Sequence, residues 1–179
     1  MACTLCLADP LIHSFDQVGS FVRDGKVCHI FYTSYKTIKD YSNSKAISAH
    51  ITGCLDGISG EPWIWMMDCK YVQAKHMMQL GVAIKLLKLL GNTYGLHLRG
   101  LYLINSGPVI NTAFTALSPF ITKEFKDTIR KVPGTPLEIL SLLTGIHGFT
   151  TAEVEPVIRR LMKEYTVKNP MTPSPKVGE

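Results

Sequence analysis

The fold of this chain is decided by Glu61-Pro62-Trp63-Ile64-Trp65-Met66-Met67-Asp68 and by the segments that follow it as far as Gly134. Trp63 to Met67 is a continuous apolar run between turn residues and Asp68, which is typical of a strand buried on both faces. Leu101 to Ile104 is a second run of this kind. Between them, Gln73 to Leu90 places its polar side chains three to six positions apart, which predicts one amphipathic helix of about five turns that ends at Gly91. Strand, helix and strand in this order predict a parallel β-α-β unit with a right-handed crossover.

The segments before this unit contain a further strand and helix. Val27 to Tyr32 is β-branched and aromatic and follows the turn sequence Arg23-Asp24-Gly25-Lys26, so we expect a strand there. The preceding residues 13–22 are predicted to form one or two helical turns. After the strand, Ser42 or Ser44 is expected to cap a helix whose apolar face recurs every fourth residue, at Ile47, Ile51 and Leu55.

The segments after the second strand alternate between helix and break. Pro108 suits the first position of a helix, and its apolar stripe consists of Ala113, Phe114, Leu117, Phe120 and Ile121. Ser118-Pro119 predicts a kink or break within this stripe. The helical pattern then resumes through Phe125 and Ile129. A short closing strand at Lys131-Val132 and two helices, one over 136–143 and one from Thr150 or Thr151 to about Tyr165, complete the prediction.

The composition indicates one globular domain. The chain has 179 residues, of which 46% are hydrophobic and 18% charged, which is enough for one sizeable core. We expect a single domain over 1–166 and a flexible tail over 167–179, because the tail contains Pro170, Pro173 and Pro175 and has no apolar period. The net charge of +5 permits contact with anionic surfaces without requiring it.

The ends and the cysteines of the sequence favour a cytoplasmic protein. No apolar run is long enough to span a bilayer, and the first residues lack the basic start and apolar core of a signal peptide. The five cysteines, an odd number, are scattered at Cys3, Cys6, Cys28, Cys54 and Cys69. This distribution favours free thiols in a reducing compartment over a disulfide framework.

Candidate catalytic and metal sites are few. The sequence has no nucleophile elbow, phosphate-binding loop, dinucleotide fingerprint or zinc-protease helix. Cys3-Thr4-Leu5-Cys6 is compatible with a redox pair or half a zinc site, and the segments 50–54 and 69–76 each bring a cysteine near a histidine. Buried free cysteines and surface histidines are the commoner outcome. We therefore predict no enzyme activity, no metal, no cofactor and no nucleic-acid partner.

Four motifs in order resemble the CRAL-TRIO lipid-binding domain family, which includes phosphatidylinositol-transfer and α-tocopherol-transfer proteins. Residues 65–70, WMMDCK, resemble its strand I-M-D-L-K/R-G, and residues 101–108, LYLINSGP, are similar to its Y-I-I-N-x-P strand and turn. Residues 113–129 look like its F-x-x-x-K-P-F-L segment with the later K-I pair. Residues 24–27, DGKV, loosely resemble the D-x-x-G-R-P-V that opens its first strand. The resemblance covers roughly residues 20 to 145.

The resemblance implies an α/β, three-layer CRAL-TRIO-like domain. Its sheet would be mostly parallel, and a mobile helical gate over 111–129 would roof an elongated apolar cavity. The residues expected to line that cavity and its gate are Met66, Tyr102, Asn105, Phe114, Leu117, Phe120, Ile121, Phe125 and Ile129. Without the resemblance, the phenylalanine stripe would favour a helix packed on the sheet with nothing bound, and the resemblance shifts the preference to the cavity. The expected ligand is a lipid or another hydrophobic small molecule.

The sequence departs from the family pattern at several positions. The lysine of the family's K-I pair, which contacts the inositol phosphate in phosphoinositide-binding members, is Thr128 here, and Glu124 stands at a gate position that is basic in the tocopherol-transfer type. The closing L-P-x-E-Y-G-G signature is replaced by residues 145–149, GIHGF, and the N-terminal helical module is not in this sequence. The residues that stand near enough to substitute in headgroup or membrane contact are Lys123, Lys126, Arg130 and Lys131.

Two functions of different classes follow. The first is a non-catalytic carrier or sensor that buries a lipid under the gate and touches an anionic membrane surface transiently. The second is a protein-interaction scaffold of the same fold with a collapsed cavity and a protein partner. The phenylalanine-rich gate favours the carrier, whereas the missing inositol-contacting lysine and helical module favour the scaffold.

Overall fold

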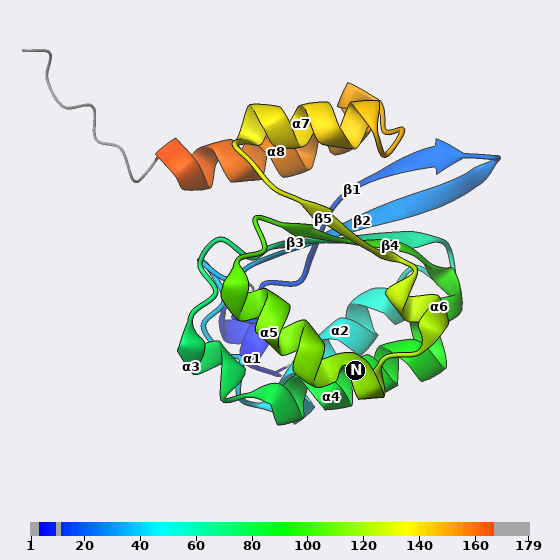
Figure 1. The fold of residues 1–179 in the computed structure, drawn as a ribbon. Helices are drawn as coiled ribbons and strands as arrows, with labels where there is room; N and C mark the ends of the chain where they lie inside the picture. Colours follow the sequence, from blue (N-terminus) through cyan, green and yellow to red (C-terminus); the bar gives the residue numbers. More distant parts are fainter. Residues whose placement is uncertain (1–3, 10–11, 167–179) are drawn as a thin grey trace, which may run out of the picture.

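A five-stranded sheet forms the centre of the protein, seen in a computed structural model that describes residues 4–9 and 12–166 (Figure 1). The strands lie in the order of the sequence, which is β1 (Asp16–Arg23), β2 (Lys26–Ser34), β3 (Trp63–Asp68), β4 (Leu98–Ile104) and β5 (Ile129–Val132). Strands β2 to β5 are parallel, and only the β1–β2 pair is antiparallel. The mostly parallel sheet and the predicted strands at Val27, Trp63 and Leu101 are therefore confirmed.

Strand β1 replaces the helical turns expected for residues 13–22, so that prediction was wrong. The turn between β1 and β2 explains the outcome, because Asp24 and Gly25 both have positive φ, at 53° and 72°. Two such residues make the tight turn that matches the twist of a hairpin. The hairpin pairs Arg23 with Lys26 and continues to Asp16 opposite Tyr32. Pairing with β2 thus provides hydrogen-bond partners for the backbone of residues 16–23, whose sequence pattern does not by itself decide between helix and strand.

The crossover between β3 and β4 is broken, whereas one continuous helix was predicted. It consists of α3 (Ala74–Met77), α4 (Leu80–Leu89), a π-helical turn η1 (Leu90–Tyr94) and a 3₁₀ turn η2 (Gly95–His97). Gly91 does not end the helix. Tyr94 anchors the extra turn, since its carbonyl accepts from Trp63 Nε1 at 3.3 Å and its hydroxyl donates to Asp56 at 2.6 Å.

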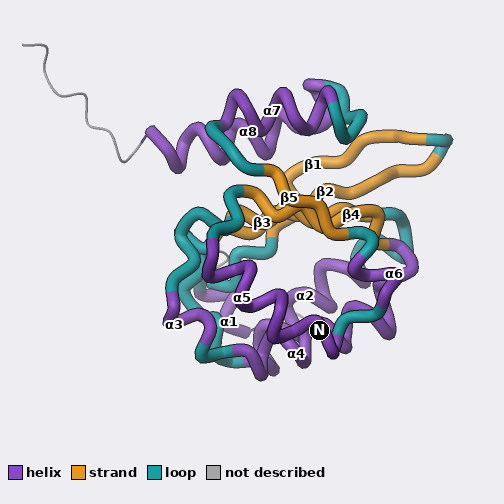
Figure 2. The backbone as a smooth tube through the Cα atoms, in the orientation of Figure 1, coloured by secondary structure: helices purple, strands orange, loops and turns teal. Residues whose placement is uncertain are grey.

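Helices cover both faces of the sheet and make three layers (Figures 1 and 2). Helices α7 (Pro136–Gly145) and α8 (Thr151–Thr166) cover one face and form what we call the α7–α8 layer. Helices α2 (Ser44–Asp56), α4 and α5 (Pro108–Leu117) cover the other, with the short α1 (Thr4–Ala8), α3 and α6 (Lys123–Lys126) at its margins; we call it the α4 layer. The predicted three-layer α/β architecture is confirmed.

The segment after β4 follows the sequence closely until residue 128. Pro108 is the first residue of α5, and a 3₁₀ turn η3 (Ser118–Phe120) breaks the helix at the expected position. Helix α6 is capped by the Thr122 side chain and has only one turn. The expected helical continuation through Ile129 is wrong, because Ile129 pairs with Leu101 as the first residue of β5.

The remaining helix predictions differ only in detail. Asn43, not Ser42 or Ser44, caps α2, whose buried residues are Ile47, Ile51 and Leu55 as expected. Thr135 caps α7, and Thr150 exchanges backbone and side-chain hydrogen bonds with Glu153 at the start of α8. The predicted tail over 167–179 lies outside the described residues.

Candidate ligand-binding site

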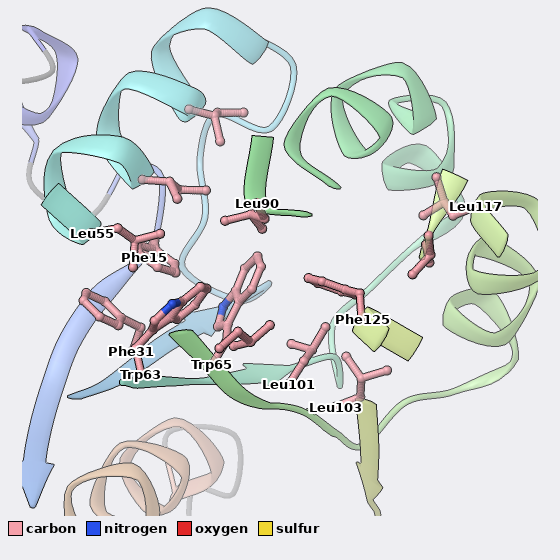
Figure 3. Close-up of a cluster of buried hydrophobic side chains, with 14 of the residues drawn as sticks. Phe15, Phe31, Leu55, Trp63, Trp65, Leu90, Leu101, Leu103, Leu117 and Phe125 are labelled. Atoms are coloured by element: carbon pink, nitrogen blue, oxygen red, sulfur yellow. The ribbon is translucent and has the colours of Figure 1, made fainter. Parts of the chain in front are cut away.

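An apolar cavity of about 180 Å³ lies in the α4 layer, between the sheet and the helices that cover it. The sheet contributes Trp65, Met67 and Leu101 to its walls. The helices contribute mainly aliphatic and aromatic side chains, which are Leu80, Val82, Ala83, Leu86, Leu87 and Leu90 from the crossover and Ile110, Ala113, Phe114, Leu117 and Phe125 from the later segments. In the close-up, Leu90 lies above Trp65, and Phe125 and Leu101 lie beside that ring (Figure 3).

The roof of the cavity is loosely packed. Helix α4 has the sequence LGVAIKLLKL, yet none of its ten residues is fully buried. Its side chains Val82, Ile84 and Leu86 are only partly buried where they contact the core. A helix this apolar is normally buried. Five of its partly buried side chains, Leu80, Val82, Ala83, Leu86 and Leu87, instead line the cavity.

Three of the predicted gate residues line the cavity. Phe114 and Leu117 come from α5 and Phe125 comes from α6, and the last two are buried. Phe120 is different, since it is 45% exposed and is not part of the cavity wall. Ile121 and Ile129 belong to the same core cluster but border a neighbouring groove.

Met66 and Tyr102 do not line this cavity, so the prediction that they contribute to its walls was wrong. Successive side chains of a strand point to opposite faces. Trp65 and Leu101 point into the α4 layer, and Met66 and Tyr102 therefore point into the α7–α8 layer, where both are buried. Tyr102 contacts the rings of His147 and Phe149 there.

Asn105 also has a structural role and does not line the cavity. Its φ of 54° is left-handed, a conformation that asparagine tolerates well. Its side-chain amide donates to the Tyr165 hydroxyl, and its Oδ1 accepts from the Gly134 backbone amide at 3.0 Å. Asn105 thus ties the end of β4 to α8 and to the turn before α7.

The neighbouring groove has a volume of about 420 Å³ and lies between α5 and β5. It shares Phe114 with the apolar cavity and carries two cations, Lys126 and Lys131. Its other walls are Asn111, Thr115, Ser118, Ile121 and Ile129. Lys131 donates to Asn111 Oδ1 at 2.7 Å, which fixes one cation at the rim.

The four predicted basic residues are not equivalent. Lys123 forms an ion pair with Asp127 at 3.0 Å on the surface, and Arg130 donates to the backbone carbonyls of Asp127 and Ile129. The backbone amide of Lys126 donates to the Thr122 carbonyl at 3.0 Å, but its ammonium group makes no hydrogen bond or ion pair with the residues that the structure describes. Of the four, Lys126 therefore has the ammonium group most available to an external anion.

The end of the cavity beneath α3 is polar, which the sequence analysis missed. Thr33 on β2, Tyr35 just beyond β2 and His76 on α3 all border it, as do His13, Tyr41 and Gln79. The His76 ring lies edgewise against Tyr35 and Tyr41, with centroid distances of 5.1 and 4.6 Å. The rule that ligands bind beyond the carboxyl ends of parallel strands was the one signal that pointed here.

Asp68, at the end of β3, lies outside the cavity. Asp68 is buried under α8, and its Oδ1 accepts from the Lys70 amide at 3.0 Å, which stabilises the turn after β3. Burial, together with a smaller effect of the nearby Glu164, raises the pKa of Asp68 to about 6.

The cysteine–histidine segments come together only in part. Cys6 Sγ lies 3.1 Å from His50 Nδ1, and Cys54 Sγ lies 3.8 Å from His50 Nε2. His50 Nε2 also lies 2.9 Å from the Phe15 carbonyl, so one ring nitrogen is already engaged by the backbone. Among residues 4–9 and 12–166, no group of three or more ligands has an arrangement suited to a metal ion.

Comparisons with known proteins agree with this architecture. The family model of the CRAL/TRIO domain matches residues 20–141, which is more than half of the chain. The chain belongs to the CRAL-TRIO domain family. At the level of the family, this membership supports lipid binding and transfer. None of the curated protein sequences matches the chain.

A solved structure supports the same fold. The crystal structure of Sfh5 is similar with a TM-score of 0.50 and 12% sequence identity over 57% of this chain and 42% of Sfh5. The CRAL-TRIO domain described here thus spans less than half of Sfh5. Within the described part of this domain, no helix is both long and apolar enough to cross a bilayer.

Proposed function

We propose that this CRAL-TRIO domain binds a hydrophobic, lipid-like molecule in the cavity of the α4 layer without catalysing a reaction on it. The observation that carries the proposal is the cavity itself, which is walled by aliphatic and aromatic side chains and roofed by an apolar helix with no fully buried residue. Mostly apolar walls with a few polar groups are the usual form of a small-molecule site.

The size of the cavity argues that one of the helices covering it moves when the ligand enters. Ligand pockets usually hold roughly 300–1,000 Å³, and this one holds about 180 Å³. Each methylene removed from water contributes about 0.8 kcal/mol, so a long acyl or isoprenoid chain supplies enough free energy to offset the displacement of a helix. The chain would enlarge the cavity as it enters.

Helix α5 and the turn after it are our candidates for the moving gate. The segment begins at Gly107, where an added Cβ would meet nothing within 4 Å, and it is interrupted at Ser118-Pro119. Phe114 borders both the apolar cavity and the lysine groove. An outward swing of α5 about these two breaks would join the two spaces.

The basic residues beside the gate suit a transient contact with an anionic membrane. Lys123, Lys126, Arg130 and Lys131 stand against Glu124 and Asp127, so four cations minus two carboxylates leave +2. A cation near an anionic leaflet contributes about 1 kcal/mol. This local charge supports brief landing and lipid exchange rather than permanent anchoring.

Loading of a fluorescent lipid tests the proposal directly. Phe114→Asp places a carboxylate in the cavity wall and should reduce loading at least about tenfold, because an unpaired charge is costly to bury. Phe125→Asp should act in the same direction. Phe120→Asp is the matched control, since Phe120 lies outside the cavity and its variant should load like the wild type. Circular dichroism spectra verify that each variant is folded.

The alternative function is a protein-interaction scaffold of the same fold, and the small volume of the cavity is the observation that favours it. A scaffold needs no exchangeable roof. Undiminished loading in both Phe114→Asp and Phe125→Asp, or no loading of the wild type by any lipid, would reject the carrier and leave the scaffold.

A further inference from the structure

The two ends of the apolar cavity differ in chemistry. At the α6 end its walls are Phe125, Leu117 and Leu101, whereas at the α3 end they include Thr33, Tyr35 and His76. Helices α3 and α6 lie at opposite sides of the α4 layer (Figure 1). A long ligand in this cavity would therefore have its chain in apolar surroundings and one terminus against hydrogen-bonding groups.

The groups at the α3 end are hydrogen-bond donors. His76 Nδ1 accepts from the Gln73 backbone amide at 2.8 Å, so the neutral ring carries its proton on Nε2. Thr33 Oγ1 accepts from Trp65 Nε1 at 2.9 Å, which leaves the hydroxyl proton of Thr33 to donate elsewhere. The Tyr35 hydroxyl makes no hydrogen bond to the residues that the structure describes.

These donors are uncharged at neutral pH. Burial lowers the pKa of His76, and the neighbouring Lys75 lowers it further. Burial raises the pKa of Tyr35 well above its ordinary value. No lysine, arginine, aspartate or glutamate borders this cavity among the described residues. An anionic head group would thus be buried here without a compensating charge, which costs much more than burying a neutral one.

The rings at this end are also held in place. His76 contacts Tyr35 and Tyr41 edgewise, at interplanar angles of 62° and 74°. Its bond to Gln73 closes the capping box of α3, so the orientation of the ring is set by the start of that helix. Donors with fixed positions favour an acceptor at one end of a ligand over a chain without one.

We propose that the cavity selects a neutral lipid with a single oxygen head group, an alcohol or a carbonyl compound, over a lipid that bears a phosphate or a carboxylate. The head-group oxygen accepts hydrogen bonds from Tyr35 and His76, and the chain runs toward Phe125. This assignment rests on the proposed function, because it requires that the cavity holds a lipid.

The lysine groove represents the competing chemistry. Its two cations, Lys126 and Lys131, suit a phosphate, but they line the groove and not the apolar cavity, with which the groove shares only Phe114. A phospholipid held by these lysines would place its head group outside the apolar cavity. The two placements therefore predict opposite orders of affinity for charged and neutral head groups.

Competition by four compounds, each with 16 carbon atoms, distinguishes between these two orders of affinity. The assay measures displacement of a fluorescent lipid from the 179-residue protein. The competitors, each delivered from cyclodextrin, are hexadecane, 1-hexadecanol, palmitate and hexadecyl phosphate. We expect 1-hexadecanol to compete about three- to tenfold better than hexadecane, the effect of one net hydrogen bond. Palmitate and hexadecyl phosphate should compete at least about tenfold less well than the alcohol.

Removal of the Tyr35 hydroxyl then tests whether this residue binds the head group. Tyr35→Phe should lower the affinity for 1-hexadecanol by about two- to fivefold and leave that for hexadecane unchanged. Tyr32→Phe is the matched control, since it removes a hydroxyl from β2, three residues before Tyr35, on the opposite face of the sheet and should change neither. Equal effects of both variants on the alcohol would overturn the assignment.

The remaining outcomes separate this proposal from the function on which it rests. Equal competition by hexadecane and 1-hexadecanol, or stronger competition by hexadecyl phosphate, would overturn the neutral head-group site while the lipid-binding function stands. Binding of none of the four compounds, and of no fluorescent lipid, would reject the lipid-binding function and the head-group site together.

Discussion

The two helical layers cover the same sheet but are packed differently. In the α7–α8 layer, Ile139, Leu143, Val154, Val157 and Leu161 are completely buried against β2, β3 and β4. In the α4 layer, the ten residues of α4 include none that is fully buried, and a cavity remains between helix and sheet. The α7–α8 layer thus packs these side chains completely, whereas the α4 layer, although it buries Phe15, Leu55 and Trp63, keeps a cavity beneath α4. In our proposal this cavity is the part that admits a ligand.

The difference follows from how the helices meet the sheet. Helix α8 is long, covers the hairpin strand β1 closely and is tied to it by an ion pair between Arg160 and Asp16. At that contact an added Cβ on Gly19 would lie 3.3 Å from Pro156, so even a methyl group is tight there. Apart from the 13-residue α2, the α4 layer consists of helices of four to ten residues joined by irregular turns, a form that can rearrange at lower cost.

The largest expected effect comes from deleting equal side chains in the two layers. Leu161→Ala should lower the free energy of unfolding by about 2–5 kcal/mol, because it leaves a void in a closely packed core. Leu86→Ala removes a partly buried side chain that already borders a cavity, so we expect a loss under about 1.5 kcal/mol. Urea unfolding followed by circular dichroism measures both. Similar losses for the two variants would contradict the contrast between the layers.

A smaller effect on the free energy of unfolding should come from Asp68, whose carboxyl group is buried beneath α8. Because burial raises the pKa of Asp68 from 3.8 to about 6, the folded protein binds this proton more tightly than the unfolded chain does. The associated stability is present below pH 4 and is lost as the pH rises through about 6. Asp68→Asn should therefore stabilise the protein at pH 8 by about 1–3 kcal/mol and have little effect at pH 4.

Comparing the wild type with Asp68→Asn at each pH cancels the contribution that the histidines make to the stability of both proteins. Burial lowers the pKa of His13, His76 and His147, so their contribution to stability has the opposite sign and is lost as the pH falls below 6.5. Thermal unfolding of wild type and Asp68→Asn between pH 4 and pH 8 gives the difference. A difference that does not change with pH would show that Asp68 does not titrate in this range.

Much of the fold was predictable because the strand and break signals are local. The apolar runs at Trp63 and Leu101, the turn at Asp24-Gly25 and the break at Ser118-Pro119 all occur where the sequence predicts them. The helical prediction for residues 13–22 failed because β1 owes its conformation to pairing with β2. The break between α3 and α4 lies at Met78 and Gln79, and neither residue is a proline or a glycine that would predict it.

The site was only partly predictable, for a related reason. Phe114, Leu117 and Phe125 were found from helical spacing, since one stripe of α5 and α6 must face the core. Both strands are apolar on both faces, so their sequences could not indicate which face borders the cavity, and Met66 was placed there instead of Trp65. Tyr35 and His76 meet only in the tertiary structure.

The smallest expected effect concerns the surface beside the gate. Lys126→Glu should slow lipid transfer between anionic vesicles by up to roughly tenfold, because each charge near the surface contributes about 1 kcal/mol. Lys123→Glu is the control, since Lys123 is already paired with Asp127 and should matter less. The difference between the variants should vanish near 1 M salt, where the screening length is about 3 Å. Equal slowing with neutral vesicles would show that Lys126 supports the fold of the gate and not membrane contact.

Hydrogen exchange with and without a bound lipid tests the contrast between the layers most directly. The account predicts that 1-hexadecanol slows exchange of the backbone amides in α3, α4 and α5, whose side chains border the cavity, and leaves α7 and α8 unchanged. Protection that appears in α7 and α8, or that is uniform over both layers, would contradict the claim that the ligand is held in the α4 layer.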